Sequence, residues 1–216
     1  MGRFDEERTE MIGLLTDRGI TDPELLRAMA AVPRHLFVPE PFTTRSYEDS
    51  ALPIGKDQTI SQPYTVAFMT QALGIRPGQK ILEVGTGSGY QAAVLAEMGA
   101  RVFSIERNLD LLAGARKVLE RLNYRVVAKG GDGTIGWSEF APFDGIIVTA
   151  GAPEVPAPLP KQLAEGGRLV IPVGSLATQT LLVITRHGDE FMRQSLEGFK
   201  FVPLIGKMGW GREDIN

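Results

Sequence analysis

A glycine-rich turn between a strand-like run and a helix-like run most limits what this chain can fold into. Residues 80–84 form a short apolar run, glycines follow at positions 85, 87 and 89, and a helical pattern covers about residues 90–98. In this context glycines let the backbone turn tightly and let a ligand approach it closely. The sequence therefore predicts a binding turn at the edge of an open α/β sheet.

Short apolar runs alternate with helical patterns from Gly78 onward. Nearly continuous apolar runs suit parallel strands that are buried on both faces. We therefore predict an α/β fold with a doubly wound, mostly parallel sheet and right-handed crossovers. Strands are expected at residues 80–84, 101–106, 125–128, 143–149 and 168–173, with helices at 90–98, 109–122 and 160–164.

Both ends of the chain depart from this alternation. Strand-like runs at residues 180–186 and 191–197 flank four turn-forming residues, which predicts a C-terminal antiparallel hairpin. The N-terminal part reads as a helical extension, followed over residues 32–63 by a proline-rich segment that we expect to be irregular. We predict one compact domain, in which an extension, 1–78, packs on a core, 79–216.

The second helix of the extension is expected to begin with a capping box. In the run Thr-Asp-Pro-Glu at residues 21–24, the Thr21 hydroxyl and the Glu24 carboxylate have the spacing to satisfy each other's end of the helix. Apolar residues then recur at helical spacing. This pattern predicts that Thr21 caps the helix.

Composition excludes several kinds of site. The 216 residues include no cysteine, so disulfides, thiolate metal sites and cysteine nucleophiles are excluded. A net charge of -3 offers no general attraction for phosphate backbones, so no nucleic-acid partner is expected. The first eight residues are too charged for a signal peptide, and no apolar run reaches the ~20 residues of a membrane span. We expect a cytoplasmic monomer without a metal or a membrane partner.

The register of the glycines favours S-adenosylmethionine over a dinucleotide. A dinucleotide fingerprint would place its third small residue at position 90, which is Tyr90 here. The register is instead acidic-x-G-x-G-x-G, with Glu83 at the end of the strand. A carboxylate there could meet the ammonium group of S-adenosylmethionine and would repel a pyrophosphate. S-adenosylhomocysteine would then be the product.

Acidic residues also follow the next two strands. Glu106 ends the second strand, where a carboxylate can accept hydrogen bonds from both ribose hydroxyls of an adenosine. Asp132 lies in a glycine-rich loop after the third strand and could accept from the adenine amino group. Taken alone, each is as easily a solvated strand end or a plain turn. The inference therefore depends on the order and spacing of the three acids.

The acceptor chemistry is narrowed by what the sequence lacks. The Asn/Asp-Pro-Pro-aromatic clamp common in base N-methyltransferases is missing at residues 149–153, and cytosine C5 chemistry needs a cysteine. A hydroxyl acceptor would favour a histidine base, and only His35 and His187 occur. A carboxylate acceptor is already ionised at neutral pH, so it needs only alignment and exclusion of water. Residues 52–64 could supply hydroxyl and backbone donors.

Six motifs follow one another along the chain: VPRHLFVP at 32–39, QTISQP at 58–63, LEVGTGSGY at 82–90, GDG at 131–133, PFDGIIVTA at 142–150 and FVPL at 201–204. In this order they resemble the motifs of the protein L-isoaspartate (D-aspartate) O-methyltransferase family, from roughly residue 9 to residue 204. The resemblance implies a Rossmann-like class I S-adenosylmethionine-dependent methyltransferase. It also implies methyl esterification of the α-carboxylate of isoaspartyl residues in damaged peptides and proteins, followed by closure to a succinimide.

The resemblance also implies the site residues. Ser61 takes the active-site position, where we expect it to orient the acceptor carboxylate by hydrogen bonding and not to act as a covalent nucleophile. Other donors for that carboxylate are left open among Arg34, Lys56 and backbone amides, and no site residue is assigned in the tail, 205–216. The residues expected to contact the cofactor are Thr59, Ile60, Ser61, Gln62, Glu83, Gly85, Thr86, Gly87, Ser88, Gly89, Glu106, Arg107, Asp132 and Gly133.

Two other functions stay open at this point. One is a class I methyltransferase that acts on a small carboxylic acid or on tRNA. The other is a regulatory protein that binds S-adenosylmethionine or isoaspartyl protein without turnover. A labelled-methyl assay with an isoaspartyl peptide separates all three.

Overall fold

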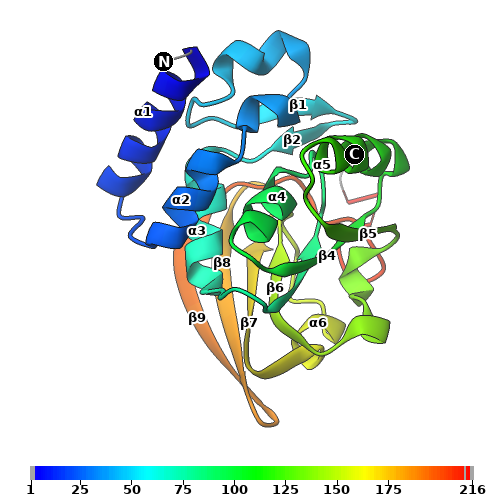
Figure 1. The fold of residues 1–216 in the computed structure, drawn as a ribbon. Coiled ribbons are helices and arrows are strands. Elements are labelled where there is room, and N and C mark those ends of the chain that lie inside the picture. The colour runs from blue at the N-terminus through cyan, green and yellow to red at the C-terminus, as the bar shows by residue number, and fades with distance from the viewer. Residues whose placement is uncertain (1–2, 212, 215–216) are drawn as a thin grey trace.

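The computed structural model describes residues 3–211 and 213–214, and its centre is a seven-stranded sheet (Figure 1). Four neighbouring pairs are parallel, whereas β8 runs antiparallel to both of its neighbours. The predicted doubly wound sheet with a C-terminal antiparallel hairpin is therefore confirmed. In spatial order the strands are β5 (Val126–Gly130), β4 (Arg101–Glu106), β3 (Lys80–Val84), β6 (Phe143–Val148), β7 (Leu163–Gly174), β8 (Gln179–His187) and β9 (Glu190–Phe199).

The two faces of the sheet carry different coverings. Right-handed crossovers from β3 to β4 to β5 place their helices on one face, and the reversed direction from β5 to β6 places the next connections on the other. The first face carries α3 (Pro63–Leu73), α4 (Tyr90–Glu97) and α5 (Leu109–Arg121). Among the described residues, the second carries only short elements: η3 (Gly133–Ile135), η4 (Ser138–Phe140) and α6 (Pro158–Lys161).

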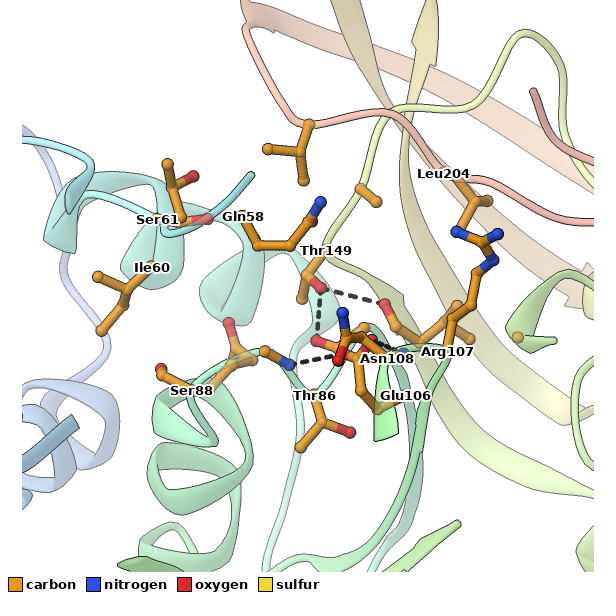
Figure 2. Close-up of a pocket in the computed structure, with 18 of the residues that line it drawn as sticks. Gln58, Ile60, Ser61, Thr86, Ser88, Glu106, Arg107, Asn108, Thr149 and Leu204 are labelled. Atoms are coloured by element: carbon orange, nitrogen blue, oxygen red, sulfur yellow. Dashed lines mark hydrogen bonds between the residues drawn. The ribbon is translucent and has the colours of Figure 1, made fainter. Parts of the chain in front are cut away.

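The interior strand β3 is buried on both of these faces. Ile81 packs into the core under the first set of helices, and Leu82 and Val84 pack into the core on the other face. The chain turns sharply where β3 ends. Thr86 follows the end of β3 and Glu106 ends the neighbouring strand β4, so both lie at the same edge of the sheet (Figure 2). This edge of the sheet is where a ligand can approach the backbone.

The N-terminal extension contains α1 (Arg3–Asp17), α2 (Pro23–Ala31), η1 (Arg34–Phe37) and η2 (Glu40–Arg45). A hairpin of β1 (Leu52–Gly55) and β2 (Gln58–Ile60) follows. The expectation that residues 32–63 are irregular throughout was therefore wrong. The hairpin turn is formed by Lys56 and Asp57, with φ of 55° and 56°. In a sequence, such a turn is usually recognised by an Asn-Gly or Asp-Gly pair, whereas the pair here is Lys-Asp.

The extension and the sheet share one hydrophobic core. Leu25, Met29 and Tyr64 from the extension belong to the same buried cluster as Ile147 and Val170 of the sheet. The segment before position 78 is therefore packed directly on the strands that follow it.

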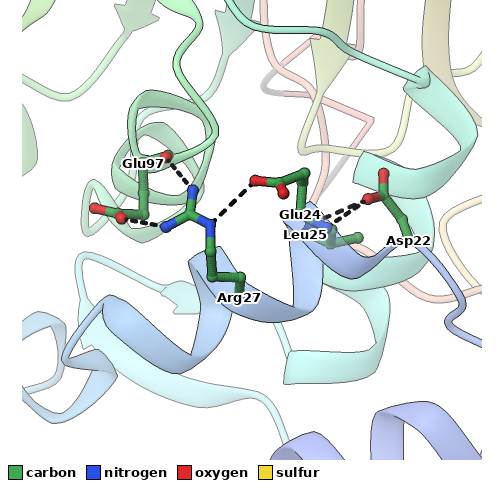
Figure 3. Close-up of polar contacts among 5 residues, drawn as sticks. All are labelled: Asp22, Glu24, Leu25, Arg27 and Glu97. Atoms are coloured by element: carbon green, nitrogen blue, oxygen red, sulfur yellow. Dashed lines mark hydrogen bonds and ion pairs between the residues drawn. The ribbon is translucent and has the colours of Figure 1, made fainter.

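The start of α2 is capped by Asp22 and not by Thr21 (Figure 3). The Asp22 carboxylate accepts hydrogen bonds from the amides of Glu24, at 3.0 Å, and Leu25, at 3.2 Å. Pro23 fits the first helical position because that position needs no amide donor. The expected capping box was thus wrong, because the cap at Asp22 puts Leu25 and not Glu24 at the third helical position. Glu24 instead pairs with Arg27, which also binds Glu97 of α4 and so joins the extension to the core.

Removing this cap should destabilise the fold by a predictable amount. We expect Asp22→Ala to lower the free energy of unfolding by about 1 kcal/mol, because two amides of the first turn lose their acceptor. Thr21→Ala should change the free energy by much less. Urea unfolding of both variants measures this, and a larger loss for Thr21→Ala than for Asp22→Ala would identify Thr21 as the cap.

Candidate functional site

A cavity of about 550 Å³ lies at the carboxyl ends of β3 and β4. Its walls come from the glycine turn, from β2 and the serine that follows it, and from the segment after β9 (Figure 2). The expected contact residues that line it are Thr59, Ile60, Ser61, Gly85, Thr86, Gly87, Ser88, Glu106, Arg107 and Gly133. The others, Gln62, Glu83, Gly89 and Asp132, do not line it.

The glycine turn leaves the backbone open to this cavity. Gly85 has φ of 100°, and a Cβ there would lie 2.3 Å from the Thr149 hydroxyl oxygen, so only glycine fits. The Thr149 hydroxyl donates a hydrogen bond to the Gly85 carbonyl, at 2.7 Å. Gly89 serves a different purpose, because a Cβ there would press on Ala115 of α5 at 3.3 Å. Gly89 therefore allows α4 and α5 to pack closely.

The Glu106 carboxylate is held at both of its oxygens. One oxygen accepts from the Gly87 amide at 2.9 Å, and the other accepts from the Asn108 amide at 2.8 Å. A carboxylate has about four lone-pair sites, so each oxygen can still accept from a ligand. Glu106 is nearly buried and lines the cavity. Its geometry suits a pair of vicinal hydroxyls.

Ser61 lies between β2 and α3, on a segment held by the N-terminal extension. Its carbonyl accepts from Arg34, and its hydroxyl makes no hydrogen bond to another described residue. Gln62 turns to Asp49, which also accepts from the Tyr64 amide at 2.8 Å. The hydroxyl of Ser61 is therefore free for a ligand, whereas Gln62 supports the start of α3.

Glu83 lies beneath the turn and not in the cavity. It is fully buried, and one carboxyl oxygen accepts from the Ser104 hydroxyl, which in turn bonds with the Thr86 hydroxyl. Burial raises the pKa of Glu83 to about 8. This shift favours the protonated form at neutral pH, which differs from the expected carboxylate facing an ammonium group. It supports the turn through Ser104 and Thr86.

Asp132 does not line the cavity and instead hydrogen-bonds with the C-terminal tail. One oxygen accepts from the Thr134 amide and hydroxyl, and the other accepts from the Lys207 amide at 2.7 Å. The Trp210 indole donates to the Gly151 carbonyl at 3.0 Å. The tail, to which sequence analysis assigned nothing, is therefore packed against the wall of the site.

Several lining residues were missed by sequence analysis. Asn108, Thr149 and the segment 202–205 all line the cavity. The only signal for them was that Thr149 and residues 201–204 lie within motifs of the family resemblance. Of the two cations left open as donors, Arg34 is fully buried away from the cavity. Lys56 lines it, and pairs with Asp110 at 2.6 Å.

Two general properties of the described residues bear on ligands. They contain no cluster of three or more histidine, cysteine or acidic side chains arranged to hold a metal ion. Within the same part of the chain, no helix has the length and apolar character needed to cross a membrane.

Comparison with known families matches residues 6–209 to a family described as protein-L-isoaspartate(D-aspartate) O-methyltransferase. Similar curated proteins carry the name protein-L-isoaspartate O-methyltransferase. One, from Salinibacter ruber, is 52% identical over 214 residues, which cover 94% of this chain and 93% of the relative. Another, from Chlorobaculum tepidum, is 54% identical over 205 residues, which cover 94% and 96%.

Solved structures give the same result. A protein-L-isoaspartate O-methyltransferase superposes with a TM-score of 0.86 at 30% identity, covering 94% of this chain and 67% of that one. A homologue from Plasmodium falciparum, solved in complex with S-adenosyl-L-homocysteine, gives a TM-score of 0.80 at 27% identity, with 92% and 98% covered.

The buried Glu83 should make stability depend on pH. Its pKa rises from an ordinary 4.5 to about 8 on folding, so between these values only the folded chain holds the proton, and stability falls as pH rises. Relative to Glu83→Gln, the wild type should lose stability by roughly 1 kcal/mol per pH unit between about pH 5.5 and 7, and by less per unit as the pH approaches 8. Urea unfolding at several pH values measures this. A constant difference would show that Glu83 is ionised in the folded protein.

Proposed function

The chain belongs to the protein-L-isoaspartate(D-aspartate) O-methyltransferase family. From this membership we propose which of its residues bind the methyl donor and which bind the acceptor carboxylate. It is an S-adenosylmethionine-dependent carboxyl O-methyltransferase. It methylates the free α-carboxylate of L-isoaspartyl residues in damaged proteins and peptides, which initiates repair through a succinimide. The main support for these assignments is that the glycine turn and Ser61 line the same cavity.

We propose that the methyl donor binds at the carboxyl ends of β3 and β4, which form the donor side of the cavity. Glu106 would accept from the ribose hydroxyls, because both oxygens are fixed and still have free lone pairs. Gly85 and Gly87 line the cavity, and without side chains their backbone would allow the amino-acid part of the donor to approach closely. When bound, the cofactor supplies a methyl group on a sulfonium. Arg107 and Gly133 would complete this side.

The acceptor side is proposed to be Ser61 and its neighbours Thr59 and Ile60. The Ser61 hydroxyl would donate a hydrogen bond to one carboxylate oxygen and aim the other at the methyl carbon. The new bond joins that oxygen to the methyl carbon as the carbon–sulfur bond breaks, and the electron pair stays on sulfur. No proton moves, so alignment and exclusion of water are what the protein must provide.

The remaining assignments concern the domain organisation, the location, the oligomeric state and the partners of the protein. Residues 1–78 would supply the acceptor side and residues 79–216 the donor side of one domain, which their common core supports. We propose a cytoplasmic monomer that uses no metal, because an ionised carboxylate needs no Lewis acid. The net charge of -3 argues against nucleic acid as a partner.

The substrate class is tested with matched peptides. We expect labelled methyl groups to enter an isoaspartyl peptide, in a form released by base, and not to enter the same peptide with a normal aspartyl bond. Transfer to a free carboxylic acid or to tRNA would indicate a different methyltransferase. Cofactor binding without any transfer would indicate a regulatory protein.

Two substitutions should separate the donor side from the acceptor side. Ser61→Ala should lower kcat strongly and leave the Kd for S-adenosylhomocysteine almost unchanged, because its hydroxyl is assigned to the acceptor. Glu106→Ala should weaken cofactor binding by about 1 to 3 kcal/mol, the usual range for hydrogen bonds to a charged group. Calorimetry and steady-state kinetics give both values. Losses of equal size in both properties for Ser61→Ala would contradict its assignment.

A further inference from the structure

Arg34 is a fully buried arginine that lies outside the cavity. It is among the largest side chains with no exposed surface, and no carboxylate of the described residues comes within salt-bridge distance of it. Burial lowers its pKa, since removing water disfavours the charged form. A buried charge without an ionic partner is costly unless hydrogen bonds compensate it.

The compensating hydrogen bonds go to two backbone carbonyls. Nε donates to the Ser46 carbonyl and Nη2 donates to the Ser61 carbonyl, both at 2.7 Å. Ser46 follows η2, so one guanidinium joins the end of that helix to the residue assigned to the acceptor. Both bonds are short and come from a planar group, which fixes the relative position of the two segments.

The same guanidinium also touches the first residue of the helix that follows the glycine turn. It lies over the Tyr90 ring, 4.7 Å from the ring centroid. Tyr90 is the first residue of α4, directly after the glycine turn, and lines the cavity. Arg34 is therefore in contact with both the serine segment and the helix that follows the turn, although it does not line the cavity itself.

We propose that Arg34 is a positioning residue that sets where the Ser61 hydroxyl stands relative to the glycine turn. The inference rests on the acceptor role proposed for Ser61. In a reaction that depends on alignment, a displacement of about 1 Å can cost on the order of 100-fold in rate. Lysine is a poor replacement for Arg34, because Nε and Nη2 are two separate donors fixed in one plane, whereas an ammonium donates from a single nitrogen on a flexible chain.

A purely structural role predicts a different outcome from a positioning role. If Arg34 only stabilised the fold, a replacement would lower the unfolding midpoint and leave kcat unchanged well below that midpoint. If Arg34 positions Ser61, kcat falls in the folded enzyme, whereas the Kd for S-adenosylhomocysteine, which the donor side controls, stays the same.

The first experiment compares Arg34→Lys with a control that disturbs buried packing away from the cavity. Leu15→Ala is the control, since Leu15 is fully buried in α1 and does not line the cavity. We expect Arg34→Lys to lower kcat on the isoaspartyl peptide by about 10- to 100-fold. Its Kd for S-adenosylhomocysteine, measured by calorimetry, should stay within about twofold, and Leu15→Ala should keep kcat. Equal kcat values for the two variants would overturn the proposal. If Arg34→Lys does not fold, the neutral Arg34→Gln takes its place.

The second experiment is a double-mutant cycle with Ser61→Ala. If Arg34 acts through Ser61, adding Arg34→Lys to Ser61→Ala should lower kcat by less than about threefold further. Multiplying losses would overturn the proposal. A Ser61→Ala variant with nearly normal kcat would instead remove the acceptor assignment itself, so the two failures are distinguishable.

Discussion

The hydrogen bond from the Gly87 amide to Glu106 joins the glycine turn to the end of the neighbouring strand. The rest of the site depends on this bond, because it fixes the turn and aims the carboxylate at the same time. Thr149 restrains the turn from the other side, and its hydroxyl oxygen occupies the space that a Cβ at position 85 would need. The backbone between β3 and α4 is thus held from two strands and stays open to the cavity.

The register of the sheet explains why three similar acids have three different roles. Glu83 pairs with Ser104, one step below the end of β3, so it is covered by the turn and held under it. Glu106 lies two residues beyond Ser104 and reaches the rim. Asp132 starts η3 and accepts from a tail residue 75 positions away. The sequence predicted the ends of β3 and β4 correctly, whereas β5 ends at Gly130, two residues beyond the expected range. The register between strands is not visible in a linear pattern.

Local signals therefore predicted the fold well and the details of the site less well. The strands and the hairpin could be predicted because each follows from its own short run of residues. The β1–β2 hairpin was missed because Lys56 and Asp57 take up positive φ without a glycine. The docked tail was missed because Asp132 and Trp210 act through distant backbone groups, which no spacing rule reports.

The chemistry of methyl transfer to a carboxylate explains why buried residues outside the cavity hold the site rigidly. An ionised acceptor and a sulfonium donor lose charge as they meet, so no general base is needed and none of the lining residues must titrate. What remains is geometry, and the structure supplies it through buried groups behind the cavity. Glu83 and Ser104 stiffen the turn from below, while Arg34 holds the Ser61 carbonyl from behind. These residues do not line the cavity, so a search for reactive groups would overlook them.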